Sequence, residues 1–326
     1  MGAELVDRFG RVVRKMRISV TDRCNFRCQY CMPSENVRWL PRGEILSFEE
    51  ITRVTRVAVG LGVRRVRLTG GEPLARPELE VLVGQLAAIE GLQDLSMTTN
   101  GYFLPEKAEA LRAAGLKSVN ISLDSLRRER FAELTRRDSL ERVLEGIRAA
   151  RAAGFPVKIN TVLMRGVNED EVADLIAWSG ENGVLLRFIE FMPLDGDRQW
   201  SRERVVTAGE ILAQAAKLGP VEAVEADPHQ PARLYRAAGV VFGIIASVSQ
   251  PFCRQCDRIR LTADGKIRNC LFALAEADLR GPLRAGADDQ QLAAVMRDAV
   301  WSKWEGHLIN QTGFRPPERA MYAIGG

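Results

Sequence analysis

The sequence predicts an α/β protein, an incomplete TIM-type β/α barrel of about six βα units followed by a C-terminal extension with further β-structure. Two observations carry this prediction. Short β-rich runs alternate with amphipathic stretches over residues 1–190, and the predicted strands are apolar and β-branched. Such strands are typical of a parallel sheet whose faces are covered by helices. Periodicity alone does not distinguish a partial barrel from a complete one.

Each predicted strand ends at a turn signal and is followed by a helical pattern. The six strands are expected at Met16–Val20, Val66–Leu68, Leu95–Thr98, Val119–Leu123, Val157–Leu163 and Leu185–Ile189. Ser47 and Glu50 have the spacing of a capping box, which predicts a helix that ends near Gly60 or Gly62. In folds of this kind, ligands bind at the carboxyl ends of the strands.

Further helices are predicted after Pro77, from Pro105 to Gly115, in two stretches before Gly154, and over Glu169–Glu181. Turn and breaker residues separate each of these from the next strand.

The alternation ends after Pro193. Beyond it, Val240–Val248 is strongly β-like and a helix is expected near Gln290–Val300. We therefore expect residues 1–195 to form the barrel. Residues 196–326 should form the extension and pack on the barrel as one unit.

Composition excludes few classes of protein. The formal net charge is +4, which permits an anionic ligand without requiring one. The sequence contains no run of about 18 apolar residues, so no membrane span is predicted. Met1–Gly10 lacks the apolar region of a secretory signal, so we expect a cytoplasmic protein.

The six cysteines fall into two groups of three, at positions 24, 28 and 31 and at positions 253, 256 and 270. Cytoplasmic thiols stay reduced, so disulfides are not expected. A buried cysteine often serves only as a small apolar residue. Two tight triads instead predict metal or cluster binding.

The first triad, Cys24, Cys28 and Cys31, follows the first predicted strand. Thiolates are the usual ligands of iron–sulfur clusters. Three cysteines leave one iron of a [4Fe–4S] cluster free to chelate a small molecule that bears an amine and a carboxylate. The alternative is zinc, but structural zinc takes four protein ligands, and only His229 and His307 are available, both distant in sequence.

The run Arg23–Cys31 resembles the signature of the radical SAM superfamily, and Thr69–Pro73 resembles its glycine-rich turn. The resemblance implies that the first triad holds a [4Fe–4S] cluster. S-adenosylmethionine (SAM) would bind the open iron and be cleaved to methionine and a 5′-deoxyadenosyl radical. The resemblance assigns contacts with SAM to Tyr30, Gly71, Ser122 and Met192.

The second triad, Cys253, Cys256 and Cys270, could hold another cluster with an open iron, or zinc with a distant ligand such as His307. Arg258 and Arg260 lie between its last two cysteines. If that segment is a strand, alternation puts both arginines on one face, where they suit a phosphate-rich ligand.

Nearly the whole chain is similar to the GTP 3′,8-cyclase family. The shared features are Ser19–Cys24, Thr98–Gly101, Arg187–Met192, the second triad and the C-terminal Gly325–Gly326. The resemblance implies that the second triad holds a [4Fe–4S] cluster whose open iron binds the guanine of GTP. It also implies attack of ribose C3′ on guanine C8, the first step of molybdenum cofactor biosynthesis. It assigns GTP contacts to Arg17, Arg67, Thr98, Lys158, Arg258, Ile259 and Arg260.

The same resemblance implies an electron donor, a downstream cyclic pyranopterin monophosphate synthase and a homodimer, with no membrane or nucleic-acid partner. The matching Gly-Gly suggests that the C-terminus reaches into the active site. One departure from the family is Glu35–Pro41, which is shorter than in some relatives and leaves the shape of that loop open.

Two other functions compete with this interpretation. A radical SAM enzyme that modifies peptides would also use auxiliary clusters, although such enzymes usually carry more than three C-terminal cysteines. A zinc-stabilised nucleic-acid-binding protein would fit the basic charge and the Cys253–Cys256 spacing.

Overall fold

The computed structural model describes residues 4–225, 227 and 229–326; the first three residues of the predicted barrel lie outside this range. In the described residues, twelve strands form one sheet in the order β12-β11-β10-β1-β2-β3-β4-β5-β6-β9-β8-β7. All pairs from β10 through β1–β6 to β9 are parallel, whereas β11, β12, β7 and β8 pair antiparallel at the two ends.

The strands are β1 Lys15–Ser19, β2 Arg65–Thr69, β3 Asp94–Thr99, β4 Ser118–Ser122, β5 Val157–Leu163, β6 Leu185–Glu190, β7 Val221–Val224, β8 Arg233–Ala237, β9 Val240–Ile245, β10 Arg258–Leu261, β11 Lys266–Arg268 and β12 Ala277–Asp278. The α-helices are α1 Phe48–Gly60, α2 Leu79–Ala87, α3 Leu104–Ala113, α4 Arg128–Thr135, α5 Leu140–Ala152, α6 Val172–Glu181, α7 Ala208–Ala215, α8 Arg280–Arg284, α9 Asp289–Trp301 and α10 Met321–Ile324.

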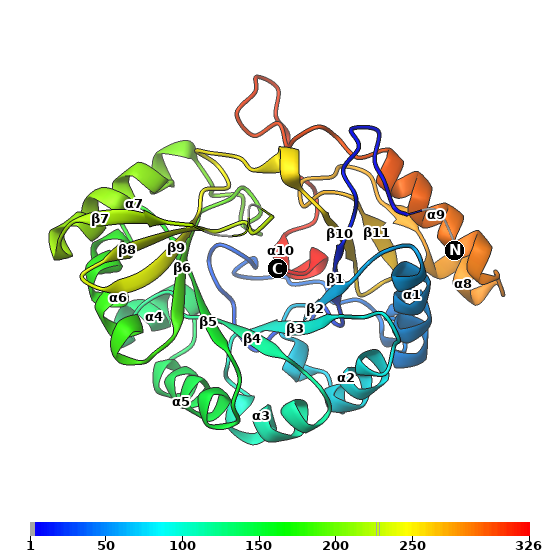
Figure 1. Cartoon of the computed structure of the whole chain (residues 1–326), viewed down its shortest axis with the longest axis horizontal. Coiled ribbons are helices and arrows are strands. Elements are labelled where there is room, and N and C mark those ends of the chain that lie inside the picture. Colours follow the sequence, from blue (N-terminus) through cyan, green and yellow to red (C-terminus); the bar gives the residue numbers. More distant parts are fainter. Residues whose placement is uncertain (1–3, 226, 228) are drawn as a thin grey trace.

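The predicted fold class is confirmed. The sheet curves into an incomplete barrel, and the helices other than α10 lie on its outer side (Figure 1). The six predicted strands correspond to β1–β6, with ends that differ by at most one residue. The predicted capping box is also present: the backbone N–H of Glu50 donates to Oγ of Ser47 at 3.1 Å, and that of Ser47 donates to Oε2 of Glu50 at 2.7 Å.

The extension joins the sheet at both edges, which the sequence pattern did not predict. β9 pairs parallel with β6, and β10 pairs parallel with β1. The predicted strand at 240–248 ends earlier, at Ile245. Because β10 runs parallel to β1, Cys253 and Cys256, which precede β10, lie at the amino ends of the strands, whereas the first triad follows the carboxyl end of β1.

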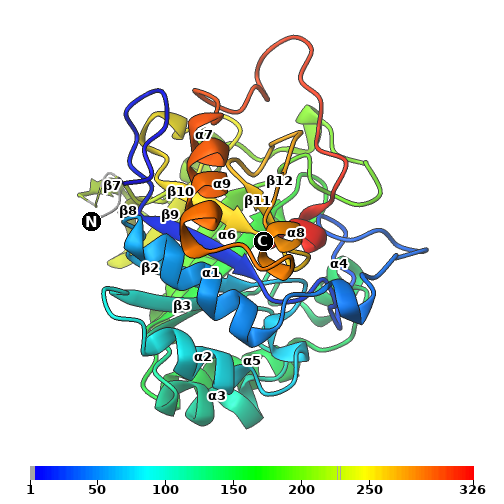
Figure 2. The same ribbon diagram turned by 90° about the vertical axis from the view of Figure 1, so that its right-hand side faces the viewer.

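The C-terminus turns back into the barrel. Figure 1 shows α10 and the C-terminal end in the middle of the ring of strands, and Figure 2 shows the same arrangement from the side. Ile324 is buried in a small apolar cluster with Leu194, Phe272 and Ile309, separate from the main core. Among the described residues, no helix has the length and apolarity needed to cross a membrane.

Helix α5 packs so closely on the turn at Gly101 that there is no room for a side chain at Gly146. A Cβ atom added at Gly146, in α5, would overlap the carbonyl oxygen of Gly101, a backbone atom that cannot rotate away. We expect Gly146→Ala to destabilise the chain by about 1–3 kcal/mol, which a lowered melting temperature would reveal. Gly209→Ala in α7, where a Cβ would meet nothing within 4 Å, is the matched control and should not lower it. Equal melting temperatures for both variants would contradict the packing argument.

Candidate active site

One cavity inside the barrel, which runs from the carboxyl ends of the strands to the second triad at their amino ends, collects almost every predicted site residue. Its lining includes Arg17, Cys24, Cys28, Tyr30, Cys31, Arg67, Gly71, Thr98, Ser122, Met192, Cys253, Cys256, Arg258, Ile259, Arg260 and Cys270. Lys158 is the exception among the predicted residues: it is half-buried on β5 and does not line the cavity. His307 lines the cavity and His229 does not.

The first triad lies on the loop that follows β1. This loop turns tightly, because the backbone N–H groups of Cys31 and Met32 both donate to the carbonyl oxygen of Cys28 at 3.0 Å. The backbone N–H of Phe26 also donates to Sγ of Cys24 at 3.3 Å. The turn therefore directs several sulfur atoms toward the same end of the cavity.

The environment of these thiols favours a bound cation. Burial, and after it Glu72, raises the pKa of Cys24 to about 12. Burial and nearby negative groups, including the other thiols of the triad, also raise the pKa of Cys28 and of Cys31. Thiols of this kind become thiolates when a metal coordinates them. The triad therefore fits a cationic group with soft ligand preferences, such as iron.

The glycine-rich turn after β2 packs directly on this loop. The backbone N–H of Gly71 donates to the carbonyl oxygen of Thr21 at 2.7 Å, and that of Glu72 donates to the carbonyl oxygen of Arg23 at 2.8 Å. A Cβ at Gly71 would overlap the carbonyl oxygens of Asp22 and Arg23. Glycine is required here so that two backbone segments can touch.

Two buried acids, neither of them predicted as a site residue from the sequence, support the predicted SAM-binding region. Glu72 accepts hydrogen bonds from Thr99 Oγ1 and the Asn100 backbone, both at 2.7 Å, and burial raises its pKa to about 7. Asp124 accepts a hydrogen bond from the Tyr30 hydroxyl at 2.6 Å, and burial raises its pKa to about 6. Their positions just beyond β2 and β4 were the available sequence signal.

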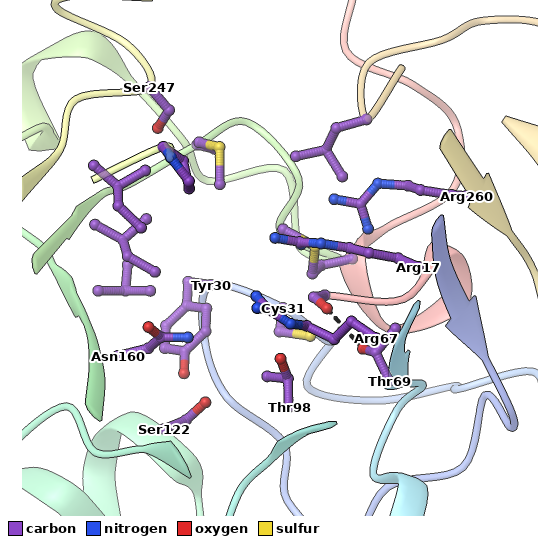
Figure 3. Close-up of a pocket in the computed structure, with 18 of the residues that line it drawn as sticks. Arg17, Tyr30, Cys31, Arg67, Thr69, Thr98, Ser122, Asn160, Ser247 and Arg260 are labelled. Carbon is purple, nitrogen blue, oxygen red and sulfur yellow. Dashed lines mark hydrogen bonds between the residues drawn. The ribbon is translucent and has the colours of Figure 1, made fainter. Parts of the chain in front are cut away.

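Five arginines, which we call the arginine cluster, occupy the middle of the cavity: Arg17, Arg67, Arg187, Arg258 and Arg260. The sheet register explains part of this grouping, since Arg17 is the direct partner of both Arg67 and Arg260 across neighbouring strands. Figure 3 shows the side chains of Arg17, Arg67 and Arg260 extending into the cavity. Within the described part of the chain, none of the five forms an ion pair with an acidic side chain.

The arginine cluster is electrostatically uncompensated. Burial, followed by repulsion from Arg260 and other members, holds the pKa of Arg17 well below its usual value. Burial and Arg258 lower the pKa of Arg260 to about 9, and burial and Arg67 lower that of Arg187 to about 9. An anion in the cavity would relieve this repulsion, so the cluster suits a ligand with several negative charges.

Arg187 is a third residue that was not predicted from the sequence, although it begins one of the runs that carried the family resemblance. Its Nη2 donates to Oδ1 of Asn120 at 2.8 Å and to Oδ1 of Asn160 at 2.6 Å. Its Nε is buried and has no protein partner in the described structure. Lys158 lies close enough for Arg187 and Arg67, after burial, to lower its pKa.

The second triad lies on the other side of the arginine cluster. Cys253 and Cys256 sit at a short 3₁₀ turn before β10, and Cys270 follows β11. The backbone N–H of His307 donates to Sγ of Cys253 at 3.5 Å, and Nζ of Lys303 donates to Sγ of Cys256 at 3.4 Å. Hydrogen bonds to sulfur are typical of cysteines that bind iron–sulfur clusters.

Cys256 differs electrostatically from the other five cysteines. Burial by itself would raise its pKa, but Arg258 and Lys303 outweigh that effect and lower it to about 6. Burial raises the pKa of Cys253 and of Cys270. Among the residues that the structure describes, no three His, Cys, Asp or Glu side chains converge closely enough to ligate one metal ion.

The C-terminal tail closes one side of the cavity. The hydroxyl of Thr69 donates to the carbonyl oxygen of Gly326 at 2.6 Å (Figure 3), and Arg260 donates to that of Gly325. Gly325 has a φ of +80°, and a Cβ there would lie 3.0 Å from Thr69 and 3.1 Å from Ser19. Both the conformation and the close approach therefore require glycine at position 325.

Comparison with known proteins agrees with this arrangement. Residues 18–179 match the Radical SAM superfamily, and residues 184–309 match the Molybdenum Cofactor Synthesis C family. The fold and the family match over residues 18–179 define a radical SAM enzyme.

Relatives place the chain more narrowly. A GTP 3′,8-cyclase of Rhodococcus opacus (strain B4) is 51% identical over 99% of this chain and 93% of its own length. The GTP 3′,8-cyclase of Streptomyces coelicolor is 49% identical over 99% of this chain and 96% of its own length. The chain belongs to the GTP 3′,8-cyclase family of radical SAM enzymes.

Solved structures agree on the architecture. Streptococcus suis SuiB matches 96% of this chain and 77% of its own, with a TM-score of 0.64 and 14% sequence identity. A crystal structure of SuiB bound to S-adenosylmethionine matches with a TM-score of 0.63. At this identity the likeness shows the fold alone.

The unequal thiols lead to a prediction about reactivity. In the cluster-free chain at pH 7, we expect iodoacetamide to modify Cys256 fastest, because a pKa of about 6 leaves this thiol mostly ionised. The rate at Cys256 should level off above pH 7, whereas the rate at Cys24 should still be rising at pH 9. Mass spectrometry of the labelled peptides measures each site, and equal rates at all six cysteines would contradict the electrostatic assignment.

Proposed function

We propose that this chain converts GTP to (8S)-3′,8-cyclo-7,8-dihydroguanosine 5′-triphosphate, the first step of molybdenum cofactor biosynthesis. The arginine cluster between the two cysteine triads is the observation that carries the proposal. Five guanidiniums without acidic partners, of which Arg187 and Arg260 are buried, suit a triphosphate better than a neutral or cationic substrate. The names of the half-identical relatives support the same substrate.

In this proposal, Cys24, Cys28 and Cys31 hold a [4Fe–4S] cluster that binds SAM. When bound, these groups supply a 5′-deoxyadenosyl radical, and the protein positions it. Tyr30, Gly71, Ser122 and Met192 are the proposed SAM contacts, and all four line the cavity. Asp124 fixes the Tyr30 hydroxyl, and Glu72 braces the glycine-rich turn.

Cys253, Cys256 and Cys270 hold a second [4Fe–4S] cluster in this proposal, with the guanine of GTP at its open iron. Contacts with the nucleotide are assigned to Arg17, Arg67, Thr98, Arg258, Ile259 and Arg260, to which we add Arg187. Lys158, which does not line the cavity, would act through its charge beside Arg187 and Arg67. Fixing both ends of GTP would hold ribose C3′ near the radical and C8 within reach of C3′. Such positioning is the main source of selectivity for a radical that attacks most C–H bonds.

The remaining assignments belong to the same proposal. Cleavage of SAM needs one electron, so an electron donor must reach the first cluster. A cyclic pyranopterin monophosphate synthase would consume the product. The homodimer, the cytoplasmic location, the absence of nucleic-acid and membrane partners, and the division at residue 195 rest on the sequence-based interpretation.

Anaerobic reconstitution tests the function directly. We expect about eight irons per chain, with matching sulfide. Incubation with dithionite, SAM and GTP should then yield 5′-deoxyadenosine and the cyclised nucleotide. A variant with serine at all three second-triad positions should retain about four irons and yield no cyclised nucleotide. Zinc in place of iron, or 5′-deoxyadenosine formation that is indifferent to GTP, would refute the proposal.

Replacing Arg187 should weaken GTP binding. Arg187→Met removes a buried charged donor from the cavity, and the loss of such a hydrogen bond costs about 1.5–3 kcal/mol, roughly a 10- to 100-fold rise in Kd. Arg56→Met, at an exposed position on α1, is the control and should leave Kd unchanged. Calorimetry with GTP and the loaded protein measures both. Unchanged affinity in Arg187→Met would remove this residue from the substrate site.

Removing Gly325 and Gly326 should abolish turnover while leaving both clusters in place. The deletion frees the Thr69 hydroxyl and the Arg260 guanidinium from their carbonyl partners and opens that side of the cavity to water. Iron content and product formation are measured on the same preparation. Full turnover by the shortened chain would show that the tail has no part in the reaction.

A further inference from the structure

Lys303 is a buried lysine directly behind the second triad. It lies two residues beyond the end of α9 and is only 3% exposed. Its ammonium group donates to the carbonyl oxygen of Arg258 at 2.8 Å, to that of Cys256 at 3.2 Å, and to Sγ of Cys256 at 3.4 Å. The three N–H bonds of the ammonium are thus all directed at the protein segment that carries the triad.

The charge on Lys303 has no acidic partner. Within the described ranges, no carboxylate lies within salt-bridge distance of its Nζ. A buried ammonium is costly unless a negative group compensates it. Unlike Arg258 and Arg260, Lys303 does not line the cavity, so a substrate phosphate cannot serve as that group. Sγ of Cys256, 3.4 Å from Nζ, can supply the compensating negative charge once the triad ligates a metal.

The position of Lys303 relative to the triad is fixed from two sides. The Arg11 guanidinium donates to the carbonyl oxygen of Cys253 at 2.8 Å and to that of Glu305 at 2.6 Å, and its Nε pairs with buried Asp7 at 2.6 Å. Nδ2 of Asn269, beside Cys270, donates to the carbonyl oxygen of Ala299 in α9 at 3.0 Å. Figure 1 shows the N-terminal segment lying beside α9.

We propose that Lys303 is a positioning residue for the second cluster, holding a fixed positive charge and an N–H···S hydrogen bond against the Cys256 thiolate. The proposal rests on the proposed function, because it requires that cluster to be present. Reduction adds one negative charge to a cluster, and a nearby ammonium stabilises the reduced form more than the oxidised form. Lys303 therefore raises the reduction potential of the second cluster and slows its loss.

The test isolates the second cluster in the full-length chain. The parent carries Cys24→Ala, Cys28→Ala and Cys31→Ala, so that iron and sulfide can rebuild a cluster only at the second triad. Lys303→Met removes the charge and leaves no hydrogen-bond donor. Lys303→Gln removes the charge and keeps a polar amide. Lys303→Arg keeps the charge. Lys217→Met, at an exposed position after α7, is the control.

Two measurements are made on each loaded variant. In a redox titration followed by electron paramagnetic resonance, both neutral variants should shift to a more negative midpoint potential. Lys303→Arg should shift less, and Lys217→Met should match the parent. On addition of an iron chelator, the neutral variants should lose iron roughly 10- to 100-fold faster than the parent.

The outcomes separate this inference from the proposed function. If the parent takes up zinc and no iron, the proposed second cluster is refuted, and the proposed role of Lys303 is refuted with it. If the parent loads iron and either neutral variant keeps the parent's midpoint potential, only the role of Lys303 is overturned. A neutral variant whose cluster-free form melts like the parent but which cannot retain iron supports the role.

Discussion

The structure depends on a group of like charges held together inside the barrel. Arg17 stands between Arg67 and Arg260 on three neighbouring strands, and the sheet register brings these side chains into one cavity. Buried guanidiniums without counter-charges oppose folding, as the lowered pKa values of Arg17, Arg187 and Arg260 indicate. The extensive apolar core beneath the cavity must offset that repulsion. Neutral oxygen atoms of Asn120, Asn160 and the C-terminal tail accept hydrogen bonds from these arginines and partly compensate the repulsion.

The arginine cluster also explains why the two cysteine triads lie where they do. The first triad follows β1 and the second brackets β10, the strand that pairs with β1. Each triad is thus tied to an arginine-bearing strand, with the positive charge between them. An anionic ligand held by these arginines would lie between the two triads, in the cavity that both of them line. The family relationship and the geometry therefore describe the same site.

The extension is part of the barrel in structural terms. Its strands continue the parallel sheet on both edges, through β9 beside β6 and β10 beside β1. Its C-terminal residues return to the opposite side of the cavity, where Gly326 meets Thr69 of β2. The second triad is consequently fixed to the first through paired backbone, and Arg11 and Lys303 brace it from outside. This construction suits a reaction in which two separated groups must act on one molecule.

The sequence alone determined the βα alternation, the capping box at Ser47, the two triads and the family resemblance, because all of these are local patterns or short motifs. It did not determine which edges of the sheet β9 and β10 would join, since strand pairing over such distances leaves no local signal. For a related reason, the sequence did not predict the roles of Glu72, Asp124, Arg187 and Lys303. An acid after a strand or a lysine after a helix is ordinary in sequence, and only burial beside a particular partner gives it a role. The tertiary structure alone decided those partners, because it brings together side chains from strands and loops that are remote along the chain.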